Sequence, residues 1–226
     1  MIKARKARPR VNHQSPITNH KLIKALFFDV DGCLTDGRIY LADDGNDFKV
    51  FDTKDGHGIK RAVAAGLAVA WISGRSSRAT ARRARELGVR FCRQGVPPDG
   101  KLAVYRELCR KLRLDPSETA AMGDDEPDVP LLRAAGFSAC PSDAAPPALT
   151  AAQVVLERPG GRGAAREFID LVLAANAGDG TRNAGEPRTA PPSRDGTRKP
   201  EAGGDQPLTA SRRRSRKSQA APIPSR

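Results

Sequence analysis

An apolar run that ends in two acids constrains this chain more than any other stretch. The run Leu26-Phe27-Phe28 is followed directly by Asp29-Val30-Asp31-Gly32. Large apolar side chains without polar alternation are typical of a strand that is buried on both faces. In an open parallel α/β sheet, ligands bind beyond the carboxyl ends of the strands, so the two carboxylates are candidates for chemistry. The alternative is an ordinary exit from a strand, because Asp and Gly also favour turns.

The pattern of a strand, a polar loop and a helix recurs along the chain. We predict further strands over 67–72, 89–92, 119–122, 137–140 and 154–156, and helices over 59–65, 76–87, 101–112, 129–135 and 164–175. Such alternation predicts an α/β fold, a three-layer Rossmann-like arrangement around a parallel sheet. Two short β-prone segments, 39–41 and 48–51, flank an Asp-Gly turn and predict a β-hairpin beside the acids. The hairpin is either a flap or a plain connection, and no insertion is long enough to form a cap domain.

Charge divides the chain into three parts. The net charge is +13, but residues 1–20 hold five basic and no acidic residues, and residues 177–226 hold 11 basic and five acidic residues. We expect a basic N-terminal extension over 1–20, one folded domain over 21–176 and a Pro-, Gly-, Ser- and Arg-rich tail over 177–226. Both ends are expected to be disordered, because they cannot bury enough apolar surface to offset chain entropy. The tail lacks interleaved aromatic residues, so we expect no specific nucleic-acid partner.

The cysteines and the hydropathy exclude several classes of protein. The four cysteines are far apart and form no C-x-x-C pair, so neither a zinc site nor a disulfide scaffold is indicated. No run reaches the roughly 18 apolar residues that a membrane-spanning helix needs. The first 20 residues lack the apolar core of a secretory signal. We therefore expect a cytoplasmic protein without a membrane partner.

Polar groups follow the other predicted strands as well. Ser73 follows 67–72, Lys101 opens the helix after 89–92, and Gly123-Asp124-Asp125-Glu126-Pro127-Asp128 follows 119–122. A lysine at a helix start opposes the helix dipole, although lone lysines are also common there. Crowded acids are best tolerated around a cation, and Mg²⁺ prefers oxygen ligands. Together these groups match the needs of phosphoryl transfer to a carboxylate, namely a nucleophile, an acid/base, donors for the phosphoryl oxygens and a metal.

Two further groups have open interpretations. The residues before Ile59 either expose backbone N–H groups to an anion or form an ordinary capped turn. Arg75 and Arg83 are eight residues apart, so they share a helix face if the helix begins at or before Arg75.

The order of these motifs resembles the haloacid dehalogenase superfamily of phosphohydrolases. Its D-x-D, Ser/Thr, Lys and G-D-D-x-x-D motifs correspond to residues 29–31, Ser73, Lys101 and residues 123–128. More narrowly, the chain is similar to the capless 3-deoxy-D-manno-octulosonate 8-phosphate phosphatase family. The narrower resemblance extends over about residues 22–176 and is carried by residues 29–37, 54–59, 72–76, 94–95 and 160–164.

The resemblance implies a role for each motif. Asp29 is expected to attack phosphorus, Asp31 to act as general acid and base, and Ser73 and Lys101 to bind the phosphoryl oxygens. It implies Mg²⁺ held by the Asp29 side chain, the Asp31 main-chain carbonyl and the Asp124 side chain. Supporting positions are Asp125, Asp128 and Arg162. The sugar-acid substrate is expected to contact Asp31, Asp52, Thr53, Lys54, Asp55, Gly56, Lys60, Arg75, Arg83 and Lys101.

The resemblance also implies a homotetramer, in which the hairpin and Gly160-Gly161-Arg162-Gly163 close a neighbour's site. The expected substrate is 3-deoxy-D-manno-octulosonate 8-phosphate. The alternatives are an N-acylneuraminate 9-phosphate, a noncatalytic module that binds a phosphorylated ligand, and a nucleic-acid end-processing phosphatase guided by the basic tails. Two departures from the family pattern concern a longer loop before Lys101 and a lysine at position 60, where an arginine is usual.

Overall fold

A parallel six-stranded sheet forms the centre of the fold. The computed structural model describes residues 21–41, 43 and 47–183, so the extension over 1–20 and the tail from residue 184 lie outside the described residues. The strand order is β5-β4-β1-β6-β7-β8, and every neighbouring pair is parallel. The predicted parallel α/β fold is confirmed. The strands are β1 (Ala25–Phe28), β4 (Ala68–Ile72), β5 (Phe91–Arg93), β6 (Thr119–Met122), β7 (Phe137–Cys140) and β8 (Val154–Val155).

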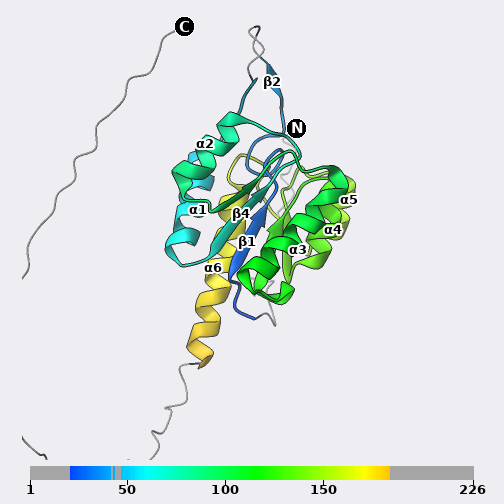
Figure 1. Ribbon diagram of the computed structural model, residues 1–226. Coiled ribbons are helices and arrows are strands. Elements are labelled where there is room, and N and C mark those ends of the chain that lie inside the picture. Colours follow the sequence, from blue (N-terminus) through cyan, green and yellow to red (C-terminus); the bar gives the residue numbers. More distant parts are fainter. Residues whose placement is uncertain (1–20, 42, 44–46, 184–226) are drawn as a thin grey trace, which may run out of the picture. The chain divides into compact units, whose positions relative to one another are not determined.

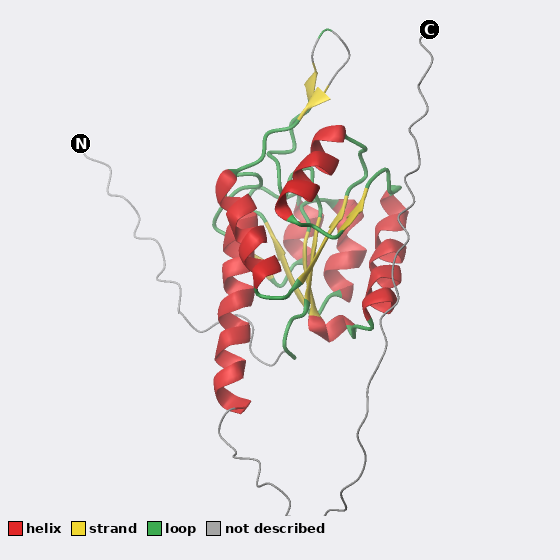
Figure 2. Cartoon of the chain, turned by 60° about the vertical axis from the view of Figure 1, so that its left-hand side comes forward, coloured by secondary structure: helices red, strands yellow, loops and turns green. Residues whose placement is uncertain are grey.

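Helices cover both faces of the sheet (Figures 1 and 2). Helices α1 (Thr53–Ala64), α2 (Arg78–Leu87) and α6 (Ala164–Asn183) lie on one face, and α3 (Lys101–Leu112), α4 (Val129–Ala134) and α5 (Pro146–Ala151) lie on the other. Leu26 and Phe28 of β1 pack into the first layer, whereas Ala25 and Phe27 pack into the second. This double burial explains why β1 shows no polar alternation. Short 3₁₀ turns are η1 (Pro98–Gly100), η2 (Pro116–Glu118) and η3 (Glu126–Asp128).

The predicted hairpin is present and projects beyond the helices (Figures 1 and 2). Strands β2 (Tyr40–Leu41) and β3 (Asp47–Phe48) pair antiparallel, and the rings of Tyr40 and Phe48 stack with their centroids 5.0 Å apart. Four apolar side chains at the hairpin and its base are each more than half exposed, namely Ile39, Leu41, Phe48 and Val50. The structure therefore leaves an apolar surface on the hairpin.

Helix α1 begins earlier than the predicted range 59–65. The side chain of Asp52 caps it by accepting a hydrogen bond from the backbone N–H of Lys54 at 2.7 Å. Gly56 and Gly58 lie inside its first turns. A Cβ at Gly56 would lie 2.2 Å from Nη2 of Arg83. Of the two alternatives for the residues before Ile59, the structure shows a capped helix start, and only the predicted boundary at 59 is wrong.

Helix α6 continues past the predicted end near Ala175 and reaches Asn183. Residues 177–183, which the sequence-based boundary gave to the tail, are therefore helical. Alanine is the best helix former, and the stretch Ala174-Ala175-Asn176-Ala177 carries the helix past that boundary. The first proline after it is Pro187. Among the described residues, we find no helix with the length and hydropathy needed to cross a membrane.

Candidate active site

The loop after β1 is folded tightly against the end of β6. The backbone N–H groups of Leu34 and Thr35 both donate to the carbonyl of Val30, at 2.9 and 3.0 Å. Gly32 has a φ of +101°, and a Cβ there would lie 2.0 Å from Oδ2 of Asp124. Only glycine meets both requirements, the positive φ and the close approach. The glycine of the D-x-D-G motif therefore lets two acidic loops approach each other.

Asp29 and Lys101 form the buried centre of the site. Nζ of Lys101 lies 2.6 Å from Oδ1 of Asp29 and 2.7 Å from Oδ1 of Asp128. Asp29 and Lys101 are each 6% exposed. Lys101 occupies the first turn of α3, directly after η1, and it reaches Asp29 in spite of the longer loop before it. The departure noted in the sequence therefore does not remove this lysine from the site.

Burial and charge set the protonation of these groups. Burial raises the pKa of Asp29 well above its usual range, and the charge of Asp128 adds to this, while Lys101 acts in the opposite direction. Burial alone would lower the pKa of Lys101, but the charges of Asp29 and Asp128 outweigh it and raise that pKa. The lysine is thus held as a cation between two carboxylates.

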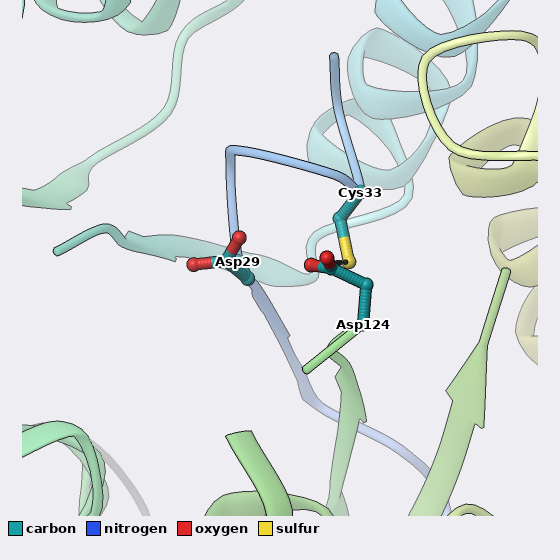
Figure 3. Close-up of side chains that lie close together, drawn as sticks. All are labelled: Asp29, Cys33 and Asp124. Atoms are coloured by element: carbon teal, nitrogen blue, oxygen red, sulfur yellow. Dashed lines mark hydrogen bonds between the residues drawn. The ribbon is translucent and has the colours of Figure 1, made fainter. Parts of the chain in front are cut away.

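Asp29, Asp124 and Cys33 bring one ligand atom each to within 4.8 Å of one another (Figure 3). The Cys33 thiol donates to Oδ1 of Asp124 at 3.5 Å. Burial raises the pKa of Asp124 to about 7, with a further increase from the charge of Asp128. A buried and a half-buried carboxylate that repel each other fit a divalent cation, which would offset their charge. Cys33 was not expected in this group, although its place four residues after Asp29 could have indicated it.

The side chain of Asp31 lies outside this group and has two other partners. Oδ1 pairs with Nζ of Lys49 at 2.5 Å, and Oδ2 lies 3.1 Å from Oγ of Ser73. If Asp31 contributes to a metal site, its main-chain carbonyl is the atom left for that role, as the resemblance implies. Sequence reasoning missed Lys49. The alternation Phe48-Lys49-Val50 on a hairpin arm was the available signal.

The strand ends border an open cavity of about 190 Å³. It is lined by Asp29, Asp31, Gly74, Arg75, Val96, Pro98, Lys101, Asp124, Asp125, Pro127 and Asp128. Ser73 is fully buried and reaches this group through its contact with Asp31. Asp128 also accepts the backbone N–H groups of Asp124 and Asp125, at 3.2 and 3.3 Å. The structure thus gathers the predicted nucleophile, acid/base, phosphoryl-binding groups and metal ligands around one cavity.

Several expected substrate residues do not line this cavity. Helix α2 begins at Arg78 after a Ser77 cap, so Arg75 precedes the helix and shares no helix face with Arg83. The guanidinium of Arg83 lies against Gly56 and pairs with Glu86 at 2.8 Å. The other expected substrate positions outside the cavity are Asp52, Thr53, Lys54, Asp55, Gly56 and Lys60, and the supporting position Arg162 also lies outside it.

Asp55 has a structural environment. It is 2% exposed, and its carboxylate accepts the backbone N–H groups of Gly163 at 3.1 Å and Arg166 at 2.7 Å. Those groups belong to the start of α6, so Asp55 joins α1 to α6. Lys54 lines a second cavity, of about 530 Å³, together with Arg158 and Arg166.

The glycine turn before α6 supports the loop after β1. The backbone N–H of Gly161 donates to the carbonyl of Cys33 at 2.9 Å. A Cβ on Gly160 would lie 1.7 Å from the carbonyl oxygen of Gly32. Glycine is required because the two backbones touch. This part of the Gly-Gly-Arg-Gly segment therefore packs on its own chain's acidic loop.

The chain is similar to known phosphatases. The family model of haloacid dehalogenase-like hydrolases matches residues 46–136. A 3-deoxy-D-manno-octulosonate 8-phosphate phosphatase from Salmonella typhi is 38% identical over 165 residues, which cover 71% of this chain and 87% of that protein. The protein of the same description from Escherichia coli K12 is 39% identical over 153 residues, which cover 68% and 80%.

Solved structures agree with these relatives. The Moraxella catarrhalis phosphatase, in complex with a magnesium ion, a phosphate ion and KDO (3-deoxy-D-manno-octulosonate), matches with a TM-score of 0.67 at 36% identity and covers 73% of this chain and 93% of that chain. The cobalt-bound phosphatase from Haemophilus influenzae matches with a TM-score of 0.64 at 35% identity and covers 69% and 90%. The acids, the serine and the lysine of this chain lie together at one edge of its sheet. The chain belongs to the haloacid dehalogenase-like hydrolases and, within them, to the 3-deoxy-D-manno-octulosonate 8-phosphate phosphatase family.

Proposed function

We propose that the chain is a Mg²⁺-dependent phosphatase that hydrolyses 3-deoxy-D-manno-octulosonate 8-phosphate to KDO and phosphate. The observation that carries the proposal is the convergence of Asp29, Asp31, Lys101 and Asp124 on one cavity. The relatives of this description, and the neighbour that binds magnesium, phosphate and KDO, support the substrate and the metal.

In the proposed reaction, an oxygen of Asp29 attacks the phosphorus of the substrate. The bond between phosphorus and the sugar oxygen breaks, and that oxygen takes a proton from Asp31. Water then loses a proton to Asp31 and attacks the aspartyl phosphate, which releases inorganic phosphate and restores Asp29. Asp31 therefore acts as acid in the first step and as base in the second.

Buried donors have a defined task in this scheme. Lys101 already contacts Asp29, so its ammonium group lies where the transferring phosphoryl oxygens would arrive. Ser73 adds a hydroxyl at the end of β4. Donors that are in place before the reaction stabilise the developing charge without reorganisation. When bound by Asp29 and Asp124, Mg²⁺ would offset the negative charge of the phosphoryl group and the carboxylates.

Phosphate release from a panel of sugar phosphates, with and without a chelator, tests this function. We expect turnover of the eight-carbon substrate that chelator abolishes and Mg²⁺ restores. Asp29→Asn is expected to abolish phosphate release and to retain the fold, as measured by circular dichroism. Unchanged turnover in this variant would remove Asp29 from the role of nucleophile, and a wild-type chain without turnover on any substrate would favour the noncatalytic alternative.

A nine-carbon substrate such as N-acylneuraminate 9-phosphate is the main chemical alternative. Comparison of kcat/KM on the two sugar phosphates separates them, and a large preference for the nine-carbon compound would reverse the assignment. Truncation after Asn183 tests the alternative of a nucleic-acid end-processing phosphatase guided by the basic tails. Unaffected sugar-phosphate hydrolysis in that variant would leave the basic tail without a catalytic role.

We also propose that the active unit is a homotetramer in the cytoplasm. The cavity of about 190 Å³ is smaller than the roughly 300–1,000 Å³ of usual ligand pockets, so one chain alone gives an eight-carbon sugar acid little enclosure. The exposed apolar side chains of the hairpin offer a surface for a neighbouring copy. The hairpin would then help to close a neighbour's site. Light scattering with Leu41→Glu tests this assembly, and an unchanged tetramer would exclude the hairpin from the interface.

A further inference from the structure

The base of the hairpin places a lysine inside the site. Phe48 and Val50 are each 53% exposed, whereas the side chain of Lys49 between them is only 5% exposed. Alternate residues of an extended segment point to opposite sides. The same arm therefore turns its apolar side chains outward and its one cation inward.

The buried ammonium group has a specific partner. Nζ of Lys49 lies 2.5 Å from Oδ1 of Asp31, whose side chain is 25% exposed and lines the small cavity. Ordering a long lysine side chain at a buried position costs conformational entropy and desolvation. A charge-assisted hydrogen bond offsets these costs and also fixes the direction of the carboxyl group.

The second oxygen of Asp31 has a less dedicated partner. Oγ of Ser73 lies 3.1 Å from Oδ2 of Asp31 and 2.9 Å from the carbonyl oxygen of Arg75. One hydroxyl has a single hydrogen, so it cannot donate to both. In the proposed reaction the same hydroxyl also binds a phosphoryl oxygen. Among the described residues, the hydrogen bond found for the ammonium group of Lys49 is the one to Asp31, so Lys49 is the more constant tether of that carboxyl group.

We propose that Lys49 is a positioning residue that holds the carboxyl group of Asp31 toward the leaving-group oxygen. The inference rests on the proposed phosphatase reaction, in which Asp31 protonates the sugar oxygen as its bond to phosphorus breaks. It also connects the hairpin to the chemistry, because Lys49 belongs to the hairpin's base. The role differs from that of Lys101, which contacts the nucleophile.

Leaving-group chemistry provides a readout that a purely structural role would not change. An alkyl alcohol leaves poorly unless it is protonated, whereas p-nitrophenolate leaves without a proton. The value of kcat/KM reports the reaction up to departure of the leaving group, so the shared hydrolysis of the aspartyl phosphate does not affect it. Misplacement of Asp31 should therefore slow the alkyl phosphate much more than the aryl phosphate.

The experiment compares wild type, Lys49→Met and Lys49→Arg on 3-deoxy-D-manno-octulosonate 8-phosphate and p-nitrophenyl phosphate. For Lys49→Met we expect kcat/KM to fall by about tenfold to a hundredfold on the sugar phosphate and by less than about threefold on the aryl phosphate. Lys49→Arg keeps the charge and should recover most of the loss. Lys111→Met is the matched control, because Lys111 is exposed on α3 and contacts the ring of Phe91.

The ratio of the two kcat/KM values does not depend on how much of a variant is folded, since both rates scale with the same concentration of active protein. An equal fall on both substrates would reduce Lys49 to a structural role, and no fall on either would remove the tether altogether. Each result would overturn the inference. A wild-type chain that hydrolyses neither compound would instead contradict the proposed function.

Discussion

Replacing Asp128 by asparagine tests the buried charge network around the nucleophile. In wild type, Oδ1 of Asp128 accepts from Lys101, and Oδ2 accepts the N–H groups of Asp124 and Asp125. Asparagine has one acceptor oxygen, so its NH₂ group must face a donor on one side. The loss of a hydrogen bond to a charged group is about 1.5–3 kcal/mol, and relief of the repulsion on Asp29 offsets part of it. We expect a net loss of about 2 kcal/mol in the free energy of unfolding.

Urea denaturation at neutral pH in the presence of a chelator measures this loss. In thermal unfolding, a loss of about 1 kcal/mol lowers the melting temperature of a domain of this size by about 2–4 °C, so we expect a fall of about 4–8 °C. Asp99→Asn is the matched control, because Asp99 is exposed on η1 and the change removes the same charge. A surface substitution of this kind stays within about 0.5 kcal/mol of wild type. If Asp128→Asn is as stable as Asp99→Asn, the network contributes nothing and the reasoning fails.

Three further predictions concern packing, metal and pH. Gly160→Ala brings a methyl group to 1.7 Å from the carbonyl oxygen of Gly32 and should lower the free energy of unfolding in urea by about 1–3 kcal/mol. Gly178→Ala is the control, because a Cβ there meets open space, and it should raise that free energy by up to about 1 kcal/mol. Equal effects of the two variants would contradict the contact. Mg²⁺ at about 100 times its Kd should stabilise wild type by about 2.7 kcal/mol in calorimetry, and an equal gain in Asp124→Asn would place the metal elsewhere. Burial raises the pKa of Asp55 above 3.8, so its stabilising contribution is present below that pH and is lost as the pH rises through the folded pKa. In urea titrations from pH 4 to 7, wild type should lose stability relative to Asp55→Asn, and a constant difference would refute this.

The sequence predicted the groups that follow the central strands. Asp29, Ser73 and Asp124 each come directly after a buried apolar strand or its first loop residue, and parallel strands bring such positions to one edge. Lys101 was predicted because a cation at a helix start opposes the dipole preference. In each case the local pattern and the topology indicate the same edge of the sheet, so these positions could be predicted from one sequence.

Contacts between segments that are distant in sequence were not predictable in this way. The glycine at position 56 is locally typical of a loop, but the structure places it in α1, where Arg83 of α2 lies against it. Asp55 looks like a pocket residue, yet the start of α6 takes both of its oxygens. The pairing of Lys49 with Asp31 depends on how the hairpin folds back over the sheet, which the local alternation does not determine.

The hydrogen bond from Gly161 to Cys33 ties the last loop of the fold to the first. During synthesis the ribosome releases the loop that carries Asp29 early, and the glycine turn emerges only after every strand of the sheet. The nucleophile's loop therefore gains this support only after the whole sheet has been synthesised. Until Gly161 has been added to the chain, this loop lacks a backbone partner for the carbonyl of Cys33.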